Sequence, residues 1–284
     1  HPGLWRGSAG QPGCRAVMVP AMDAGKLLHL YDLEERIRAE FPDMRREEVG
    51  AIVRHVPLAP RSGFRSGFVS YARLDEEDAD EGIDAQVRYF ADLGANFEWK
   101  VYAHDWPPDL RQRLTARGFA VEEAEAIMAL ELAAAPPELL APVRHDVRLL
   151  DDPDQLDDVI AVQRSVWQRE YTGLAGYLRD MMIGHPERMA AYVAYEDGLP
   201  VAAAWLNYDA RSPFASLWGG STVATHRGRG FYVALLAARV QEANRRGARY
   251  LTIDASAMSQ PIVARFGFMH LTTAWACNWR AGDR

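Results

Sequence analysis

The segment most suited to ligand chemistry is residues 222–236, in which an apolar strand end continues through Arg227-Gly-Arg-Gly230 into an apolar helical pattern. The two glycines let the backbone approach a ligand closely, and the first-turn N–H groups of a helix have no intrahelical partner. The helix dipole adds positive potential at the same point. Residues 227–230, called the anion-binding loop from here on, therefore predict a site for a phosphate or pyrophosphate group.

A Rossmann-type dinucleotide site is one interpretation of this loop. Gly228-x-Gly230 is followed by Asp254 at roughly the distance of a ribose-binding acid. Two features oppose it. The third glycine position holds Val233, and only about thirty residues follow Asp254, too few for the further βα units of that fold.

The spacing Arg227-x-x-Gly230-x-Tyr232 instead resembles the (Gln/Arg)-x-x-Gly-x-(Gly/Ala) loop of the GCN5-related acyl-CoA N-acyltransferases, the GNAT superfamily. The elements that follow agree with that family. A helical pattern runs up to Arg245-Arg-Gly247, a strand follows at 250–254, and a short helix then ends in Gly267-Phe268. The resemblance covers residues 143–284.

Upstream of the loop, the order of expected elements also agrees with the family. We expect a strand at 145–150, two helices within 153–177 and a hairpin over Asp197-Gly198, which is a strong turn signal. A central strand at 214–223 then leads into the loop, and the resemblance implies a final hairpin at 269–280.

The resemblance implies that acetyl-CoA (coenzyme A) binds at the loop and the central strand. In GNAT folds a bulge separates that strand from its neighbour, and unpaired backbone groups receive the pantetheine and the thioester; Gly219-Gly220 is where this chain can bulge. A glycine pair also admits a neighbouring aromatic ring such as Trp218, and this alternative stays open. The expected coenzyme A contacts are Ser221, Thr222, Val223, Arg227, Gly228, Arg229, Gly230, Phe231, Tyr232 and Ser259.

Proton transfer is where the sequence departs from the family. Many members have a tyrosine four residues before the glycine of the Gly-Phe ending, but this chain has Val263. The central strand also lacks the glutamate that often acts as the base. We expect Asp254 to be the substitute, with Glu170 over the acceptor site by analogy. Asp254 equally fits a structural role as the cap of the turn that follows it.

The first half of the chain is similar to a degenerate copy of the second. Laying Gly118-Phe119 on Gly267-Phe268 needs a shift of 267 − 118 = 149 residues, and the same shift lays Asp105 on Asp254. The position of the glycine loop is held by the acidic stretch 74–82, which would repel a pyrophosphate. We expect this half not to bind coenzyme A. An unrelated α/β domain with the same Gly-Phe ending is the alternative.

Length and composition suggest where the chain divides. Its 284 residues suit two domains, and the stretch 133–142 has three prolines and no sustained period. We expect a flexible leader or expression remnant at 1–22, a degenerate GNAT-like domain at 23–132, a linker at 133–142 and a catalytic GNAT domain at 143–284.

Each domain is expected to be α/β, with a mixed, mostly antiparallel twisted sheet flanked by helices. In the first domain the periodicity predicts a helix at 25–41, strands at 49–56 and 67–74, a helix at 84–93, a strand at 97–102, a short helix at 107–117 and a strand at 121–132.

Composition limits the setting and the partners. The formal net charge of −7 disfavours nucleic acid, and no apolar run approaches the roughly twenty residues of a membrane span. The two cysteines, Cys14 and Cys277, build neither a disulfide framework nor a metal quartet. We expect a cytoplasmic protein without a metal and without a membrane or nucleic-acid partner. A homodimer is left open.

The expected function is acetyl-CoA-dependent N-acetyl transfer, directly to a primary amine of a small molecule or a peptide in a ternary complex. Such a reaction needs a neutral amine, a donor for the charge that develops on the thioester oxygen, and a route for protons. The missing tyrosine and strand glutamate motivate an alternative, which is a non-catalytic acyl-CoA sensor or scaffold.

Overall fold

The computed structural model describes residues 23–58, 66–168 and 172–282. The predicted leader at 1–22 lies outside these residues. Within them, twelve strands form one sheet in the order β1-β2-β3-β4-β12-β6-β11-β10-β9-β8-β7, and β5 pairs with β12. In this described part, the strand pairs β3–β4 and β10–β11 are parallel and the other pairs are antiparallel. The sheet is therefore mixed and mostly antiparallel, as expected.

The bounds of the elements are as follows. The first half contains α1 (Ala24–Tyr31), the π-helix η1 (Asp32–Ile37), β1 (Met44–Val49), β2 (Ile52–Pro57), β3 (Gly67–Ala72), α2 (Ala79–Asp92), β4 (Phe97–Tyr102), α3 (Leu110–Thr115), β5 (Ala120–Val121) and β6 (Glu125–Glu131). The connection contains η2 (Leu132–Ala134) and α4 (Pro137–Leu140). The second half contains β7 (Asp146–Leu149), η3 (Pro153–Gln155), α5 (Leu156–Trp167), α6 (Thr172–Gly184), η4 (Pro186–Arg188), β8 (Met189–Glu196), β9 (Leu199–Tyr208), β10 (Phe214–Thr222), η5 (Ala224–His226), α7 (Phe231–Arg245), β11 (Tyr250–Ala255), α8 (Gln260–Arg265) and β12 (Met269–Trp279).

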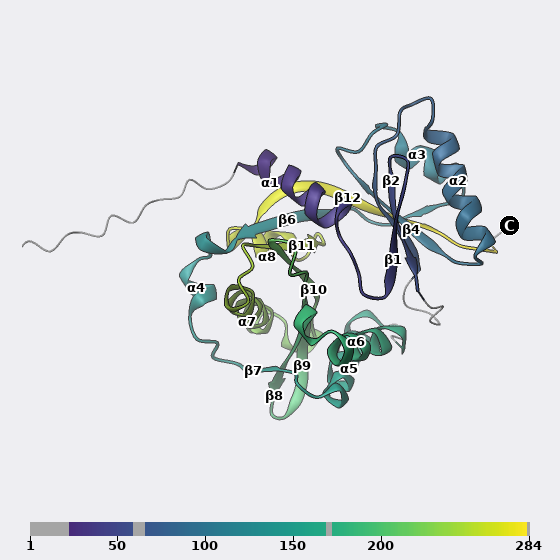
Figure 1. Ribbon diagram of the computed structural model, residues 1–284. Coiled ribbons are helices and arrows are strands. Elements are labelled where there is room, and N and C mark those ends of the chain that lie inside the picture. The colour runs from purple at the N-terminus through teal and green to yellow at the C-terminus, as the bar shows by residue number, and fades with distance from the viewer. Residues whose placement is uncertain (1–22, 59–65, 169–171, 283–284) are drawn as a thin grey trace, which may run out of the picture.

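Helices cover both faces of the sheet in the second half (Figure 1). Successive residues of β10 point to opposite faces. Ala215 and Leu217 pack in the core beneath α7, whereas Phe214 packs against α1. The helices α5 and α6 pack on the same face as α1, against side chains such as Val193 and Trp205. Because both faces of these strands are buried, the strands are apolar along most of their length.

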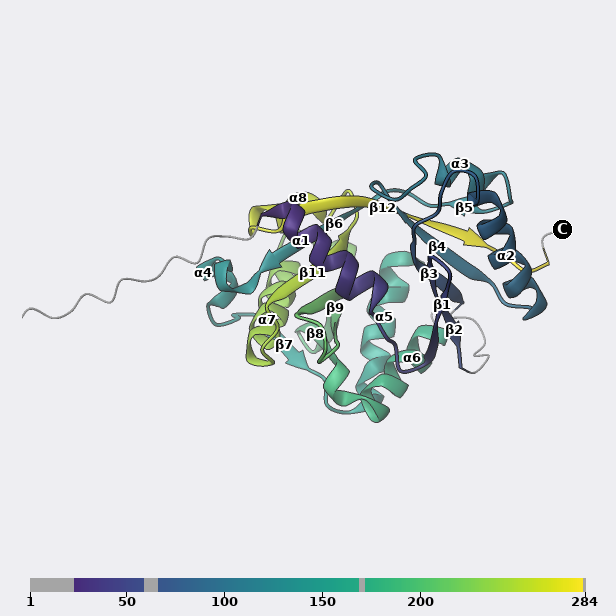
Figure 2. The same cartoon turned by 45° about the horizontal axis from the view of Figure 1, so that its top comes forward.

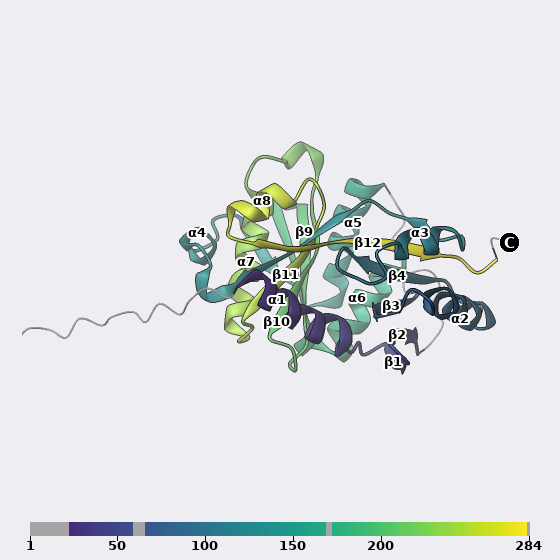
Figure 3. The same ribbon diagram turned by 90° about the horizontal axis from the view of Figure 1, so that it is seen from above.

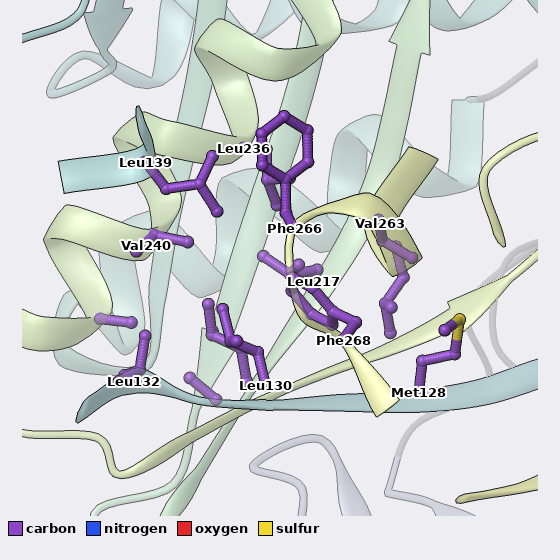
Figure 4. Close-up of a cluster of buried hydrophobic side chains, with 14 of the residues drawn as sticks. Met128, Leu130, Leu132, Leu139, Leu217, Leu236, Val240, Val263, Phe266 and Phe268 are labelled. Carbon is purple, nitrogen blue, oxygen red and sulfur yellow. The ribbon is translucent and has the colours of Figure 1, made fainter. Parts of the chain in front are cut away.

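The two halves exchange strands at the centre of the sheet. β6 of the first half pairs with β11 of the second half. β12 pairs with β6 up to Ala274 and with β4 from Ala274 onward, so it passes from one half to the other (Figure 3). Met128 and Leu130 of β6 are buried in one core with Leu217 and Phe268 (Figure 4). Each half therefore completes its core with a strand of the other.

Corresponding glycines confirm that the chain contains an internal repeat. Gly118 follows α3 with φ +86°, and Gly267 follows α8 with φ +87°. Glycine adopts this left-handed conformation without a steric cost, which suits the residue after a helix. Phe119 and Phe268, which follow the two glycines, are both buried. Each half thus repeats a strand, a short helix, a Gly-Phe ending and a further strand.

Two predicted boundaries in the first half are wrong. The helix expected at 25–41 ends at Ile37, whose carbonyl accepts hydrogen bonds from Arg46 Nε at 2.9 Å and Nη2 at 2.6 Å. The strand expected at 49–56 is in fact a hairpin, because Gly50 at φ +60° turns the chain between β1 and β2. Apart from Gly50, the residues from Val49 to Val53 are apolar, and this concealed the turn.

The hairpin expected at 269–280 is also wrong, because residues 269–279 form the single strand β12. Its sequence has no glycine or proline to turn it, and its irregularity between His270 and Thr272 is a bulge.

The equivalence of Asp105 and Asp254 fails as well. The first residue of β4 lies 118 − 97 = 21 residues before its glycine and that of β11 lies 267 − 250 = 17 before its own, so an ungapped shift misaligns the strands.

Candidate active site

The anion-binding loop has the backbone that its sequence predicts. Gly228 and Gly230 have φ angles of +73° and +88°, which side chains rarely adopt, and Gly230 is the N-cap of α7. A β-carbon on Gly230 would lie 3.1 Å from Cε1 of His145. Because Gly230 carries no side chain, a ligand can approach the first N–H groups of α7 closely. This arrangement suits a pyrophosphate.

Charged side chains surround the loop. Glu196, at the end of β8, accepts a hydrogen bond from Arg229 and lies 3.1 Å from Nε2 of His226. His145 contacts the carbonyl of Arg229 at 3.0 Å. Arg227 bends back, and its Nε donates to the carbonyl of Thr222 at 3.2 Å. Arg229 is thus held by the Glu196 carboxylate, with which a bound pyrophosphate would compete for the guanidinium.

The bulge predicted in the central strand is present. The pairing of β10 with β9 shifts register between Trp218 and Ser221, and Gly219 has φ +63°. A β-carbon on Gly219 would lie 1.8 Å from the ring of Trp205. Both interpretations of the glycine pair therefore hold, because Gly219 shapes the bulge and also admits an aromatic ring. That ring belongs to Trp205 and not to Trp218.

Where the bulge begins, β10 separates from β11. The two strands are paired from Phe214–Tyr250 to Leu217–Ile253, and both continue past that point without a shared register. The backbone of residues 218–222 therefore faces a gap on the β11 side. The N–H of Val223, one of the expected contacts, already donates to the carbonyl of Val201 at 2.9 Å.

A cavity of about 350 Å³ opens on the face of the sheet opposite α7. Its lining alternates along the strands, with Ser216 and Trp218 from β10 and Thr252 and Asp254 from β11. The first half supplies the facing wall through α1, η1, β3 and β4. Helix α1 crosses the sheet (Figure 2). This cavity, called the acceptor pocket below, lies between the two halves of the chain.

Asp254 lines the acceptor pocket at the first position after β10 and β11 part. Its Oδ2 accepts a hydrogen bond from Nζ of Lys100 on β4, and Lys100 also lies 3.5 Å from Glu125. Burial opposes the charge of Lys100, but the neighbouring Asp254, Tyr102, Glu125 and Glu98 raise its pKa well above the ordinary value. Lys100 is therefore a fixed cation beside Asp254.

Glu98 projects into the same pocket from β4. Burial raises the pKa of its carboxyl group, and the negative charges of Glu122, Asp254 and Glu125 add to the effect while Lys100 opposes it. A carboxyl group with a raised pKa beside a cleft is a candidate proton acceptor.

The other expected site residues are placed as follows. Glu170 lies outside the described residues. Val263 is fully buried in the core, and its alkyl side chain has no ionisable proton to donate. Tyr232 is half-buried, and its ring lies 3.1 Å from a β-carbon placed on Gly220. Ser259 is the N-cap of α8, with its hydroxyl 3.3 Å from that of Ser256.

Sequence reasoning missed the residues that the first half contributes to the pocket, above all Glu35, Glu98 and Lys100. One local signal existed. In 97–102, charged residues alternate with Phe97, Trp99 and Val101, and charges on one face of an otherwise apolar strand indicate a polar cavity or an ion pair. No comparable signal marked Glu35, because it lies in a run of charged residues on η1.

The described residues contain no group of three or more His, Cys, Asp or Glu side chains that could hold a metal ion. Across the same residues, no helix is both long enough and apolar enough to cross a membrane.

Comparison by sequence finds no matching family model and no matching curated protein. Comparison by structure finds clear neighbours. A GCN5-related N-acetyltransferase from Kribbella flavida aligns over 90% of this chain and 95% of its own, with a TM-score of 0.65 and 17% identity. A tandem GNAT protein from the clavulanic acid biosynthesis pathway aligns over 92% and 95%, with a TM-score of 0.57 and 15% identity.

A conserved protein of unknown function from Staphylococcus epidermidis is also similar, over 85% of this chain and 96% of its own, with a TM-score of 0.64 and 13% identity. The chain therefore has the fold of the GCN5-related N-acetyltransferases in a tandem arrangement.

Proposed function

We propose that the protein is an acetyl-CoA-dependent N-acetyltransferase that acts on a primary amine. The observation that supports this most directly is the gap between β10 and β11. On the α7 side the strand β10 leads to the anion-binding loop, and on the opposite side the gap meets the acceptor pocket at Trp218 and Asp254. A thioester held from one side thus meets an amine held from the other.

The loop residues Arg227 to Gly230 and the first N–H groups of α7 would hold the pyrophosphate of acetyl-CoA. The backbone of Ser221 and Thr222 would contact the pantetheine arm, which is a chain of amides that backbone groups can pair with. As a substrate, acetyl-CoA supplies an activated acyl group. Phe231 contributes only its backbone, because its side chain is buried against His145.

In the transfer, the acceptor nitrogen forms a bond to the acetyl carbon while the carbon–sulfur bond breaks. One proton leaves the nitrogen and one reaches the thiolate. Asp254 is positioned to take the proton directly or through a water molecule, since it is the carboxylate at the point where the strands part. Lys100 holds this carboxylate in place.

The alternative is a non-catalytic acyl-CoA sensor. Two observations favour it: Val263 stands where many relatives of this fold have a tyrosine acid, and Asp254 is already paired with Lys100. A sensor needs the loop and the gap but no proton acceptor.

A turnover assay separates the two functions. Purified protein with acetyl-CoA and a panel of primary amines should release free thiol together with an acetylated amine identified by its mass. Thiol release without an acetylated product would indicate hydrolysis only. Tight acetyl-CoA binding without turnover on any amine of the panel would replace the proposed function with the sensor.

A further inference from the structure

The far end of the acceptor pocket is formed by the π-helix η1 of the first half. Glu35 of η1 lines the pocket, and its Oε1 accepts a hydrogen bond from the hydroxyl of Ser212 at 2.6 Å. The Ser212 hydroxyl in turn accepts from the N–H of Phe214 at 3.1 Å. Glu35 is thereby fixed beside the first residue of β10, at the opposite end of the paired stretch from Asp254.

This position decides what Glu35 can do. The paired stretch from Phe214 to Leu217 spans three residue steps, on the order of 10 Å. A general base must lie within about 3 Å of the proton that it takes, or reach it through one water molecule. Glu35 is therefore too far from the acyl end to act as the base, and a carboxylate at this place can only contact a distant part of the acceptor.

Glu35 differs in its partners from the acidic residues beside it at this end of the pocket. Asp209 is paired with Arg188 at 3.1 Å and with Arg211 at 2.9 Å, and Glu40 is paired with Arg211 at 2.7 Å. Among the described residues, no cation forms an ion pair with Glu35. A partly buried carboxylate without a cation is unfavourable, and a ligand cation would relieve it.

The protonation of Glu35 reflects the same deficit. Burial raises the pKa of Glu35 to about 7, the bond from Ser212 opposes this rise, and the negative charges of Asp209, Glu34 and Asp254 add to it. An ammonium group bound beside Glu35 would lower the pKa of its carboxyl group and so favour the ionised form. The ionised form would in turn bind the ammonium group more tightly than the protonated form does.

A second polar group in the pocket also lacks a partner. The side-chain oxygen Oδ1 of Asn207 is buried and has no hydrogen-bond partner, and Asn207 lines the pocket on β9. An unsatisfied buried acceptor calls for a donor, which an amine supplies. The walls are aromatic, with Tyr31, Trp205 and Trp218 among them, and such rings attract cations.

From this geometry we infer that the acceptor is an α,ω-diamine or a polyamine, whose second ammonium group is bound by Glu35 while the first is acetylated beside Asp254. The inference rests on the proposed function, because it assigns the acceptor of the same site. It also gives the first half a role, since a residue of that half would select the substrate of the second.

The test compares 1,4-diaminobutane with n-butylamine, which has the same carbon chain and one cation less. Binding is measured by calorimetry on the full chain with coenzyme A present, and turnover is measured with acetyl-CoA. The wild-type protein should prefer the diamine by about 10–100-fold in both measurements, as expected for one charge-assisted hydrogen bond. Glu35→Gln should remove this preference, because it should weaken the binding and turnover of the diamine and leave those of n-butylamine unchanged.

Glu123→Gln is the matched control, because it removes an exposed carboxylate outside the pocket and should keep the preference. Ser212→Ala is the second variant, which keeps the charge of Glu35, removes its anchor and should reduce the preference in part. Equal binding of the two amines by the wild-type protein, or a preference that survives in Glu35→Gln, would overturn the inference. A Glu35-dependent binding preference without acetylation of any amine would overturn the proposed function alone.

Discussion

Lys100 of β4 and Asp254 of β11 form an ion pair although 154 residues separate them in the chain. The pair links the first half to the position where β10 and β11 part, and both side chains are mostly shielded, with exposures of 16% and 23%. A lysine of the first half is therefore in direct contact with the proposed base of the second half.

The first prediction concerns Asp254. Asp254→Asn keeps the shape and removes the proton acceptor, so turnover should fall by about 10²–10⁴-fold if Asp254 is the base. Acetyl-CoA affinity, measured by calorimetry, should change little. Glu125→Gln is the control, because Glu125 also contacts Lys100 but lies farther from it, at 3.5 Å. If Asp254→Asn turns over within a few-fold of the wild-type protein, the base is another group, and Glu98 is the next candidate.

The extent to which sequence predicted the site depends on how local each feature is. Some features depend on backbone conformations that residues other than glycine rarely adopt, so the local sequence reveals them. These are the loop glycines, the bulge at Gly219 and the Gly-Phe endings. The contact of Lys100 with Asp254 and the placement of Glu35 depend on pairing between distant strands. No local period encodes that pairing, and for this reason the acceptor pocket could not be predicted.

The strand exchange shows the same limit on the scale of elements. The sequence predicts β structure at 121–132 and 269–280, close to β6 and β12, but it names no partner strand in the other half for either. Met128 of β6 is apolar and would suit either core. Only the three-dimensional arrangement distinguishes a strand that closes its own sheet from one that is exchanged.

The second prediction concerns the loop. Gly230→Val should abolish acetyl-CoA binding measured by calorimetry, because its side chain would lie against His145 at the mouth of α7. Gly247→Val is the matched control at the other end of α7, with φ +80° and open space around its α-carbon. Both variants bear a similar backbone strain of about 1–2 kcal/mol. Equal affinities of the two variants would refute the assignment of the loop.

The third prediction concerns Glu196, whose carboxylate holds Arg229 and His226. Glu196→Gln should lower the KM for acetyl-CoA by a few-fold, since it removes a negative charge from the loop and frees Arg229 for the pyrophosphate. The gain should shrink as salt is added, because the charges are partly exposed. An increase of KM in Glu196→Gln would mean that the ion pair positions Arg229 and does not compete with the ligand.

The fourth prediction concerns stoichiometry. The residues before α2 are Asp75, Glu76, Glu77 and Asp78, all exposed, where α7 is preceded by the glycine loop. This charge opposes a second pyrophosphate, so one coenzyme A should bind per chain. A calorimetric titration that reaches two equivalents would show that the first half kept a site of its own.

The last prediction concerns the pH dependence of stability. The pKa of Glu35 is raised from 4.5 to about 7 in the folded chain, so the folded state binds the proton more tightly than the unfolded state. The contribution of Glu35 to the free energy of unfolding is present in full below pH 4.5 and is lost as the pH rises through 7. The free energy of unfolding of the wild-type protein should therefore fall over this range relative to that of Glu35→Gln.

The change in the free energy of unfolding relative to Glu35→Gln should reach on the order of 1–2 kcal/mol. This is less than the shift in pKa would give at about 1.4 kcal/mol per pKa unit, because water in the pocket screens the charge. Urea titrations of both proteins at pH 5 and pH 8 measure it. The variant should gain stability relative to the wild-type protein between the two pH values, and Glu123→Gln should show no such gain. If the wild-type protein and Glu35→Gln keep a constant difference from pH 5 to pH 8, the carboxyl group is already ionised in the empty pocket.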